Sequence, residues 1–390
     1  MRQYFSLIFL LIGLPIVFSV ECYFGIDKSI TYFFIACVLL IGSDLKRINL
    51  ISISVPLFFV FLLSCGIIII FITQNIFNKQ LLELGVVFYC IFLALTYKNN
   101  PDEYNKLIFI AFYISLVSIL LIYMTTPLSS AFWLFHGGRL YIGDTKNPNL
   151  VSWVAMTNII TILYIINRLD ISNIYKFVLV ITIPFSGYLY FMSFSKSSIV
   201  GLVFIFFYYF KIMKLKIIFN KWLLVIFFFL GTIIYFHEFD IVKYLNILGH
   251  AFYSLIFGGS TNMSASIRHE HFKYFLKHFS NFRLFGHGVN TFRLDSPILQ
   301  LYIDIGFEFA LFFLVLFVFI PSYIILIKKN ISVIEEYIII LYLFYLPNMF
   351  FHGTPYEWNT WLPTILFYMI FKRRKIVSTS NIIYIPKSSR

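Results

Sequence analysis

Long apolar runs separated by short polar stretches dominate the chain. A membrane-spanning helix needs about 17–25 apolar residues to cross the hydrocarbon core of a bilayer. Twelve runs of roughly this kind follow one another, of which the second, ninth and twelfth are short and the tenth is long: 4–20, 29–43, 52–73, 81–97, 107–125, 150–167, 177–193, 197–213, 222–236, 297–327, 335–351 and 358–371. The pattern predicts an all-α polytopic membrane protein with about 12 transmembrane helices in a single integral membrane domain, residues 1–390.

One long hydrophilic segment, residues 237–296, separates the ninth run from the tenth. Within it, residues 266–279 place apolar side chains at helical spacing on one side and charged side chains on the other. The apolar stripe is Phe272, Phe275, Leu276 and Phe279, and the charged side is Glu270, Lys273 and Lys277. This spacing predicts an amphipathic helix that lies near the membrane interface.

Composition agrees with a membrane protein, and the charges set its orientation. The chain is 60% hydrophobic and 12% charged, whereas soluble domains carry about 25% charged residues. With both termini in the cytoplasm, 19 of the 30 Lys and Arg residues fall on the cytoplasmic side. The net charge of +13 therefore reflects topology and does not indicate a nucleic-acid partner. The same orientation puts segment 237–296 and all eight histidines outside.

Familiar cofactor and metal signatures are absent from the sequence. The cytoplasmic loops are short and basic and contain no Gly-rich phosphate loop. The four cysteines lie in or beside apolar runs and lack metal-ligand spacing. We therefore expect no metal and no cofactor, and we expect any chemistry to take place on the outer face.

Two outer loops carry cations that could bind phosphate. Arg139 lies in the turn-rich loop 136–149, and its guanidinium can grip a pyrophosphate with two parallel hydrogen bonds; a solvated Arg at head-group level explains it equally well. At the end of that loop, Asn149 is placed to cap the sixth run. Lys196 lies among four serines in the short hinge 193–198, where it could hold a phosphate or snorkel to lipid head groups.

The hydrophilic segment supplies a second group of candidates. Arg268 and His271 are three residues apart on the amphipathic helix and can face a common site. A Gly-x-Gly turn at 286–288, which contains His287 and leads to Asn290, predicts a close backbone approach. Pro297 suits the first helical position and Ser296 the N-cap, so Asp295 lies at the mouth of the tenth run.

Two carboxylates fall inside the tenth run. Asp304 and Glu308 are four residues apart, which places them on one face of a continuous helix. Carboxylates within a span usually face a polar cavity or a basic partner. A structural ion pair and a role in catalysis are both compatible with this spacing.

Taken in order, these motifs resemble those of the O-antigen polymerase/ligase superfamily, and most closely its Wzy-type polymerases. The resemblance covers most of residues 130–320. It rests on the Arg loop with Asn-Pro-Asn (139–149), the hinge Ser-x-Ser-Lys-Ser (193–197), Ser266-x-Arg268, Phe285-Gly286-x-Gly288, and Asp295-Ser296 followed by Gln300-x5-Gly306. Two positions depart from the family pattern: ligases carry His where this chain has Asp295, which argues against a ligase, and the hinge usually carries Arg where this chain has Lys196.

The resemblance implies a metal-independent glycosyltransferase in the bacterial inner membrane. Such a polymerase joins oligosaccharide repeat units carried on undecaprenyl diphosphate at the periplasmic face, and both donor and acceptor are lipid-linked. A chain-length regulator protein and membrane lipids are the further partners implied. The alternatives are a ligase-type transferase and a flippase for lipid-linked oligosaccharides. The flippase is disfavoured because it would not need the long outer loop with its amphipathic helix, and because only three acidic residues, Glu83, Asp304 and Glu308, fall well inside spans.

Each candidate residue receives a role in this scheme. Arg139 and Arg268 are expected on the diphosphates, with weaker help from Lys196. Asp295 is the position-matched candidate for the general base, while His271 and His287 have ordinary pKa values nearer to neutral pH. The remaining expected substrate contacts are Asn149, Asn290 and Asp304.

Overall fold

The computed structural model describes the region from the fifth predicted span onward. The described residues are 104–125, 148–208 without 194, 263–279, 294–328, 331–353 and 358–371, with single positions 246, 249, 250, 253, 257, 286 and 355. The predicted spans 4–20, 29–43, 52–73, 81–97 and 222–236 lie outside these residues, as do Arg139, His287 and Asn290. Every regular element in the described part is a helix, which agrees with the predicted fold class.

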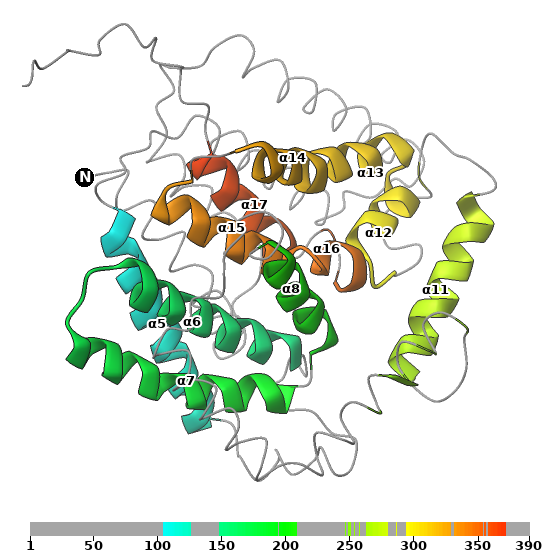
Figure 1. Ribbon diagram of the computed structural model, residues 1–390. Coiled ribbons are helices and arrows are strands. Elements are labelled where there is room, and N and C mark those ends of the chain that lie inside the picture. The colour runs from blue at the N-terminus through cyan, green and yellow to red at the C-terminus, as the bar shows by residue number, and fades with distance from the viewer. Residues whose placement is uncertain are drawn as a thin grey trace, which may run out of the picture.

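The first three described helices pack side by side (Figure 1). They are α5 (Tyr104–Thr125), α6 (Pro148–Arg168) and α7 (Asn173–Ser193). A fully buried Asn158 on α6 joins all three, because its amide donates to the Ser115 hydroxyl on α5 at 2.7 Å and accepts from the Ser186 hydroxyl on α7 at 2.8 Å. In a membrane, where apolar side chains gain little by leaving lipid, such interhelical hydrogen bonds and close packing hold helices together.

Helix α8 (Lys196–Phe207) follows α7 after a very short hinge, as the sequence predicts. It packs closely against α15 (Val333–Tyr345) through Gly201, where a Cβ atom would lie 2.3 Å from the backbone oxygen of Phe344. Glycine is therefore what allows these two backbones to approach each other. The contact holds the hinge serines beside the chain that leaves the end of α15.

The predicted tenth span is not one continuous helix. It divides into α12 (Pro297–Asp304), α13 (Phe307–Leu314), a π-helical turn η6 (Val315–Phe319) and α14 (Ile320–Ile327). The break falls at Gly306, whose φ of 127° is accessible to glycine and rarely to other residues. As predicted, Ser296 is the N-cap of α12 and Pro297 its first residue.

The expectation that Asp304 and Glu308 share one helix face is therefore wrong. Asp304 is the last residue of α12 and is buried, whereas Glu308 lies in the first turn of α13 and is exposed. The break at Gly306 interrupts the helical spacing on which the expectation depended. Asp304 instead accepts a hydrogen bond from the Gln300 amide at 2.8 Å.

The π-helical turn has a local cause. Pro321 has no backbone N–H, so the carbonyl of Phe317, four residues earlier, loses its usual helical partner. The Tyr342 hydroxyl on α15 donates to this carbonyl at 2.6 Å, and the Tyr368 hydroxyl donates to the neighbouring carbonyl of Leu316 at 2.5 Å. Buried hydroxyls from two other helices thus compensate for the irregular backbone.

Helix α15 forms the centre of the described region. A capping box between Ser332 and Glu335 starts it, and α16 (Asn348–Phe351) continues it after Pro347. Helix α17 (Trp358–Ile370) packs against α15. On the other side of α15, the hydroxyls of Tyr337 and Tyr345 form hydrogen bonds with threonine hydroxyls of α6. From this central position α15 contacts α6, α8 and α17 and so positions them relative to one another.

Three described helices are long and apolar enough to cross a membrane: Asn173–Ser193, Phe307–Ile327 and Val333–Phe351. The apolar window of the third is 89% buried inside the protein, against 28% and 33% for the other two. Most of the apolar window is therefore not buried by the protein in the first two helices, whereas nearly all of it is buried in the third. These helices agree with a membrane protein.

The amphipathic helix predicted at 266–279 is α11 (Met263–Phe279), which lies at the edge of the described structure (Figure 1). Its aromatic side chains Phe275 and Phe279 contact Tyr302 of α12, with ring centroids 5.3 and 5.5 Å apart. Phe272 and Leu276 remain exposed, and on the charged side Lys273 pairs with Glu270 at 3.2 Å. Part of the apolar stripe thus packs on the protein, and part stays open.

Candidate functional site

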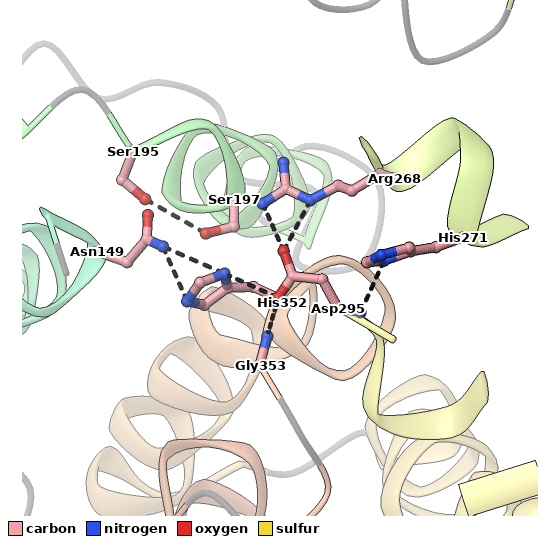
Figure 2. A network of polar contacts seen from close by, with 8 residues as sticks. All are labelled: Asn149, Ser195, Ser197, Arg268, His271, Asp295, His352 and Gly353. Carbon is pink, nitrogen blue, oxygen red and sulfur yellow. Dashed lines mark hydrogen bonds and ion pairs between the residues drawn. The ribbon is translucent and has the colours of Figure 1, made fainter. Parts of the chain in front are cut away.

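A cluster of polar side chains gathers where α6, α8, α11 and α12 meet the turn after α16 (Figure 2). At its centre, Arg268 of α11 forms an ion pair with Asp295, the residue before the N-cap of α12. The guanidinium Nε and Nη2 donate to the same carboxylate oxygen, Oδ2, at 3.0 and 2.9 Å. Both side chains are partly exposed, 25% for Arg268 and 31% for Asp295, so the pair stays accessible from outside.

The second carboxylate oxygen of Asp295 faces the turn after α16. Oδ1 accepts the backbone N–H of Gly353 at 2.9 Å and lies 3.7 Å from Nδ1 of His352. Burial alone would raise the pKa of Asp295, but His352, Arg268 and the Gly353 N–H together outweigh it and hold the pKa below its ordinary value. Asp295 is therefore ionised, and its carboxylate connects its own segment to α11 and to the turn after α16.

His352 connects Asp295 to α6. The Asn149 side-chain amide nitrogen lies 2.9 Å from Nε2 and 3.3 Å from Nδ1 of the imidazole, and the Trp153 ring meets the same imidazole edge-on at 5.6 Å. Asn149 lies inside the first turn of α6, which begins at Pro148, so its expected role as the cap of this helix is wrong. Its side chain reaches across to His352 instead.

His271, one turn along α11 from Arg268, approaches Asp295 from the other side. Its Nδ1 accepts the backbone N–H of Asp295 at 3.4 Å. Burial and the positive charge of Arg268 lower the pKa of His271, and the charge of Asp295 opposes them only in part. The prediction that Arg268 and His271 face a common site is confirmed, since both contact Asp295.

A row of serine hydroxyls lies beside Asn149, at the start of α8 (Figure 2). Ser198 donates to Ser195 at 2.9 Å, Ser195 and Ser197 are 3.3 Å apart, and Ser152 of α6 donates to Ser198 at 2.5 Å. These hydroxyls join the beginnings of α6 and α8. Lys196 is the first residue of α8, and its side chain lies outside the described atoms.

A second layer of contacts supports the segment that carries Asp295. The Gln300 side-chain oxygen accepts the Leu294 N–H at 2.5 Å, while its amide donates to Asp304. Gly286 donates its N–H to the Ile305 carbonyl at 2.8 Å, and a Cβ at Gly286 would lie 2.3–2.4 Å from backbone atoms of Asp304 and Ile305. The predicted close approach of this glycine is confirmed, and Asp304 belongs to the support beneath the site.

The sequence prediction and the structure agree on part of this cluster. Arg268, His271, Asp295 and Asn149 come together, although they are spread over about 150 residues. Sequence reasoning missed His352 and Gly353. The available signal was a histidine followed by glycine directly after an apolar run, on the same side as the other candidates, but nothing in that stretch identifies its partner.

The arrangement has the components for chemistry at a phosphate-bearing substrate. Within the described residues, Arg268 uses two of its five N–H groups on Asp295, which leaves donors for an anionic ligand. The same residues contain no group of three or more His, Cys, Asp or Glu side chains suited to a metal ion. Comparisons with protein-family models, with curated proteins and with solved structures find no match to the chain.

Proposed function

We propose that this protein is a membrane glycosyltransferase that joins oligosaccharide repeat units carried on undecaprenyl diphosphate, as a surface-polysaccharide polymerase does. The observation that carries the proposal is the ion pair of Arg268 with Asp295. It lies where four of the motifs that resemble the O-antigen polymerases converge: the start of α6, the serine hinge, the start of α11 and the start of α12.

The proposed topology places this cluster outside the cytoplasm. Twelve spans with both termini inside the cell leave residues 237–296 as a periplasmic loop, and α11 and Asp295 belong to that loop. The three helices long and apolar enough to span a bilayer support a membrane location. At the outer face of a bacterial inner membrane, a lipid-linked sugar diphosphate is the activated donor that requires no nucleotide.

Arg268 is the residue proposed to bind the leaving group. Glycosyl transfer from the lipid carrier leaves a diphosphate with developing negative charge, and a fixed donor in a partly dehydrated site stabilises that charge. Arg268 is suited to this because Asp295 holds its guanidinium in place while leaving other N–H groups for the ligand. In this proposal Arg139 and Lys196 contact the same diphosphates or that of the acceptor.

The reaction is a substitution at the anomeric carbon of the donor glycan. A hydroxyl oxygen of the incoming lipid-linked unit forms the new bond to that carbon, and the bond from the carbon to the diphosphate oxygen breaks. Its electron pair leaves with the undecaprenyl diphosphate, and the hydroxyl proton goes to a base. Neither a metal nor a reductant enters this balance.

Complementation of a deletion strain tests the proposal, with the length of the surface polysaccharide on a silver-stained gel as the measurement. We expect the wild-type gene to restore a ladder of long chains and Arg268→Ala to leave single repeat units. Loss of one such donor costs about 10²–10³-fold in rate. Arg268→Lys keeps the charge but not the planar fork, so we expect shortened chains.

Lys273→Ala is the matched control, because Lys273 lies on the same helix and pairs with exposed Glu270, away from Asp295. We expect it to give the wild-type ladder. Membrane immunoblots must show equal amounts of each variant. Long chains from Arg268→Ala at a normal protein level would refute the role of Arg268, and unaltered polysaccharide in the deletion strain itself would refute the proposed function.

A further inference from the structure

Asp295, the position-matched candidate for the general base, is poorly suited to take up a proton. Both of its oxygens are engaged, Oδ2 by two N–H groups of Arg268 and Oδ1 by the Gly353 N–H. Its pKa lies below the ordinary value of 3.8, because His352, Arg268 and the backbone N–H outweigh the effect of burial. A carboxylate in this state is a weak base at neutral pH, but it is a good partner for a cation that forms next to it.

His352 has the geometry that Asp295 lacks. Its Nδ1 faces Asp295 Oδ1 at 3.7 Å, and its Nε2 faces the Asn149 amide nitrogen at 2.9 Å. The amide nitrogen donates, and its shorter distance to Nε2 (2.9 Å, against 3.3 Å to Nδ1) favours Nε2 as the unprotonated acceptor. In a neutral ring with this acceptor, the proton is on Nδ1, toward Asp295. Trp153 packs edge-on against the ring and restricts its rotation.

We propose that His352 is the general base of the glycosyl transfer, with Asp295 and Asn149 as its positioning residues. This inference rests on the proposed function. The acceptor hydroxyl replaces the Asn149 amide at Nε2 and gives up its proton there as the new bond to the anomeric carbon forms. The Asp295 carboxylate stabilises the imidazolium that results, and the proton passes to water after the undecaprenyl diphosphate has left.

One carboxylate then serves both halves of the reaction. Its Oδ2 holds the guanidinium that faces the leaving diphosphate, and its Oδ1 lies toward the imidazole that faces the acceptor. The Asp295 carboxylate therefore fixes the position of Arg268, which stabilises the charge on the leaving diphosphate, relative to that of His352, which takes up the proton. Correct mutual placement of such groups is itself a large part of catalysis.

The groups around His352 determine how the reaction should depend on pH. Among the described residues, the Asp295 carboxylate lies 3.7 Å from the ring, with Arg268 and His271 of α11 behind it. Helix α6 presents the neutral side chains Asn149 and Trp153, and Tyr345 of α15 lies behind Trp153.

The experiment uses the full-length protein in lipid nanodiscs, with lipid-linked repeat units extracted from the deletion strain as substrate. We expect the wild-type rate to rise with pH as His352 loses its proton and then to level off. His352→Gln should lower the rate by about 10²-fold or more and abolish that rise, within the range of about 10²–10⁴ that general bases contribute. Asp295→Asn should move the midpoint of the rise to lower pH, because the imidazolium loses its counter-charge.

Two further variants separate a chemical role from a structural one. Added imidazole should restore about tenfold or more of the activity of His352→Ala, since it supplies a base without repairing a fold. His250→Gln is the matched control, because His250 is exposed, and it should behave as wild type. Monodisperse gel filtration of each variant confirms that it has folded.

The possible failures are distinguishable. If the wild-type protein forms no polymer from the extracted units, the proposed function is wrong, and the base assignment is wrong with it. If the wild type forms polymer and His352→Gln keeps more than about a tenth of its rate with an unchanged pH profile, only the assignment of His352 is overturned. Failure of imidazole to rescue His352→Ala also counts against it.

Discussion

The contact between α8 and α15 gives a prediction whose size follows from the structure. A Cβ at Gly201 would lie 2.3 Å from the Phe344 oxygen and 3.1 Å from its carbonyl carbon, and both are backbone atoms that cannot rotate away. Ordinary van der Waals contact begins at about 3.4 Å, so Gly201→Ala must move the two helices apart by roughly 1 Å. Overpacking of this kind costs about 1–3 kcal/mol.

Gly187→Ala on α7 is the matched control, since a Cβ there meets nothing within 4 Å. Both substitutions lie in helices and share the gain in helix propensity of about 1 kcal/mol. The difference between the two variants therefore isolates the steric cost. We expect Gly187→Ala to be neutral or slightly stabilised and Gly201→Ala to be less stable than it by about 1–3 kcal/mol.

The measurement is unfolding of the purified protein in detergent, by tryptophan fluorescence during heating and during titration with a denaturing detergent. We also expect Gly201→Ala to lose polymer length, because α8 carries the serines beside Asn149 and α15 leads to His352. Equal stability of Gly201→Ala and Gly187→Ala would refute the close backbone contact and, with it, this account of how the two helices place the site.

Two further predictions concern a buried hydroxyl and a histidine. Tyr342→Phe leaves the Phe317 carbonyl without its donor, so we expect it to lower the free energy of unfolding by about 1–3 kcal/mol, whereas Tyr323→Phe, at an exposed position, should match wild type; thermal unfolding of both in detergent is the check. Because the pKa of His271 is lowered in the folded protein, this side chain takes up its proton in the unfolded chain at a higher pH than in the folded one, as the pH falls through 6.5. Stability should therefore decline from pH 7.5 to 5.5 by more in the wild type than in His271→Gln, and parallel curves for the two proteins would contradict the shift.

The helices were predictable where the apolar pattern alone determines them. The predicted ends of the sixth and seventh runs lie within a few residues of those of α6 and α7, and the short hinge before Lys196 is also where it was expected. The break at Gly306 was not predicted, since a single glycine in an apolar run is compatible with a continuous helix. What decides it is packing of the Gly286 backbone against Asp304 and Ile305, and the sequence near Gly306 does not contain that contact.

The candidate site, too, could be predicted only where the local sequence pattern determines it. Arg268, His271 and Asp295 could be predicted because local spacing gives them a common helix face or a helix start. His352 could not, because its pairing with Asp295 depends on how α12 packs against α16, which are separated by more than 40 residues. Nor could the sequence predict that Asp295 is a poor base, because the strong pairing that makes it one comes from partners on two other segments.

In the proposed topology, the break at Gly306 also affects how far from the membrane the site lies. Residues 307–327 are long enough to cross the bilayer by themselves, so α12 is not needed for the crossing. At a rise of about 1.5 Å per residue, the eight residues of α12 contribute at most about 12 Å to the height of Asp295 above that span. In the proposed topology this keeps Asp295 close to the membrane surface, where the phosphates of a lipid carrier lie. α12 runs at an angle to α13 (Figure 1), whereas a continuous helix over 297–327 would follow the axis of the span throughout and carry the same carboxylate farther from the membrane.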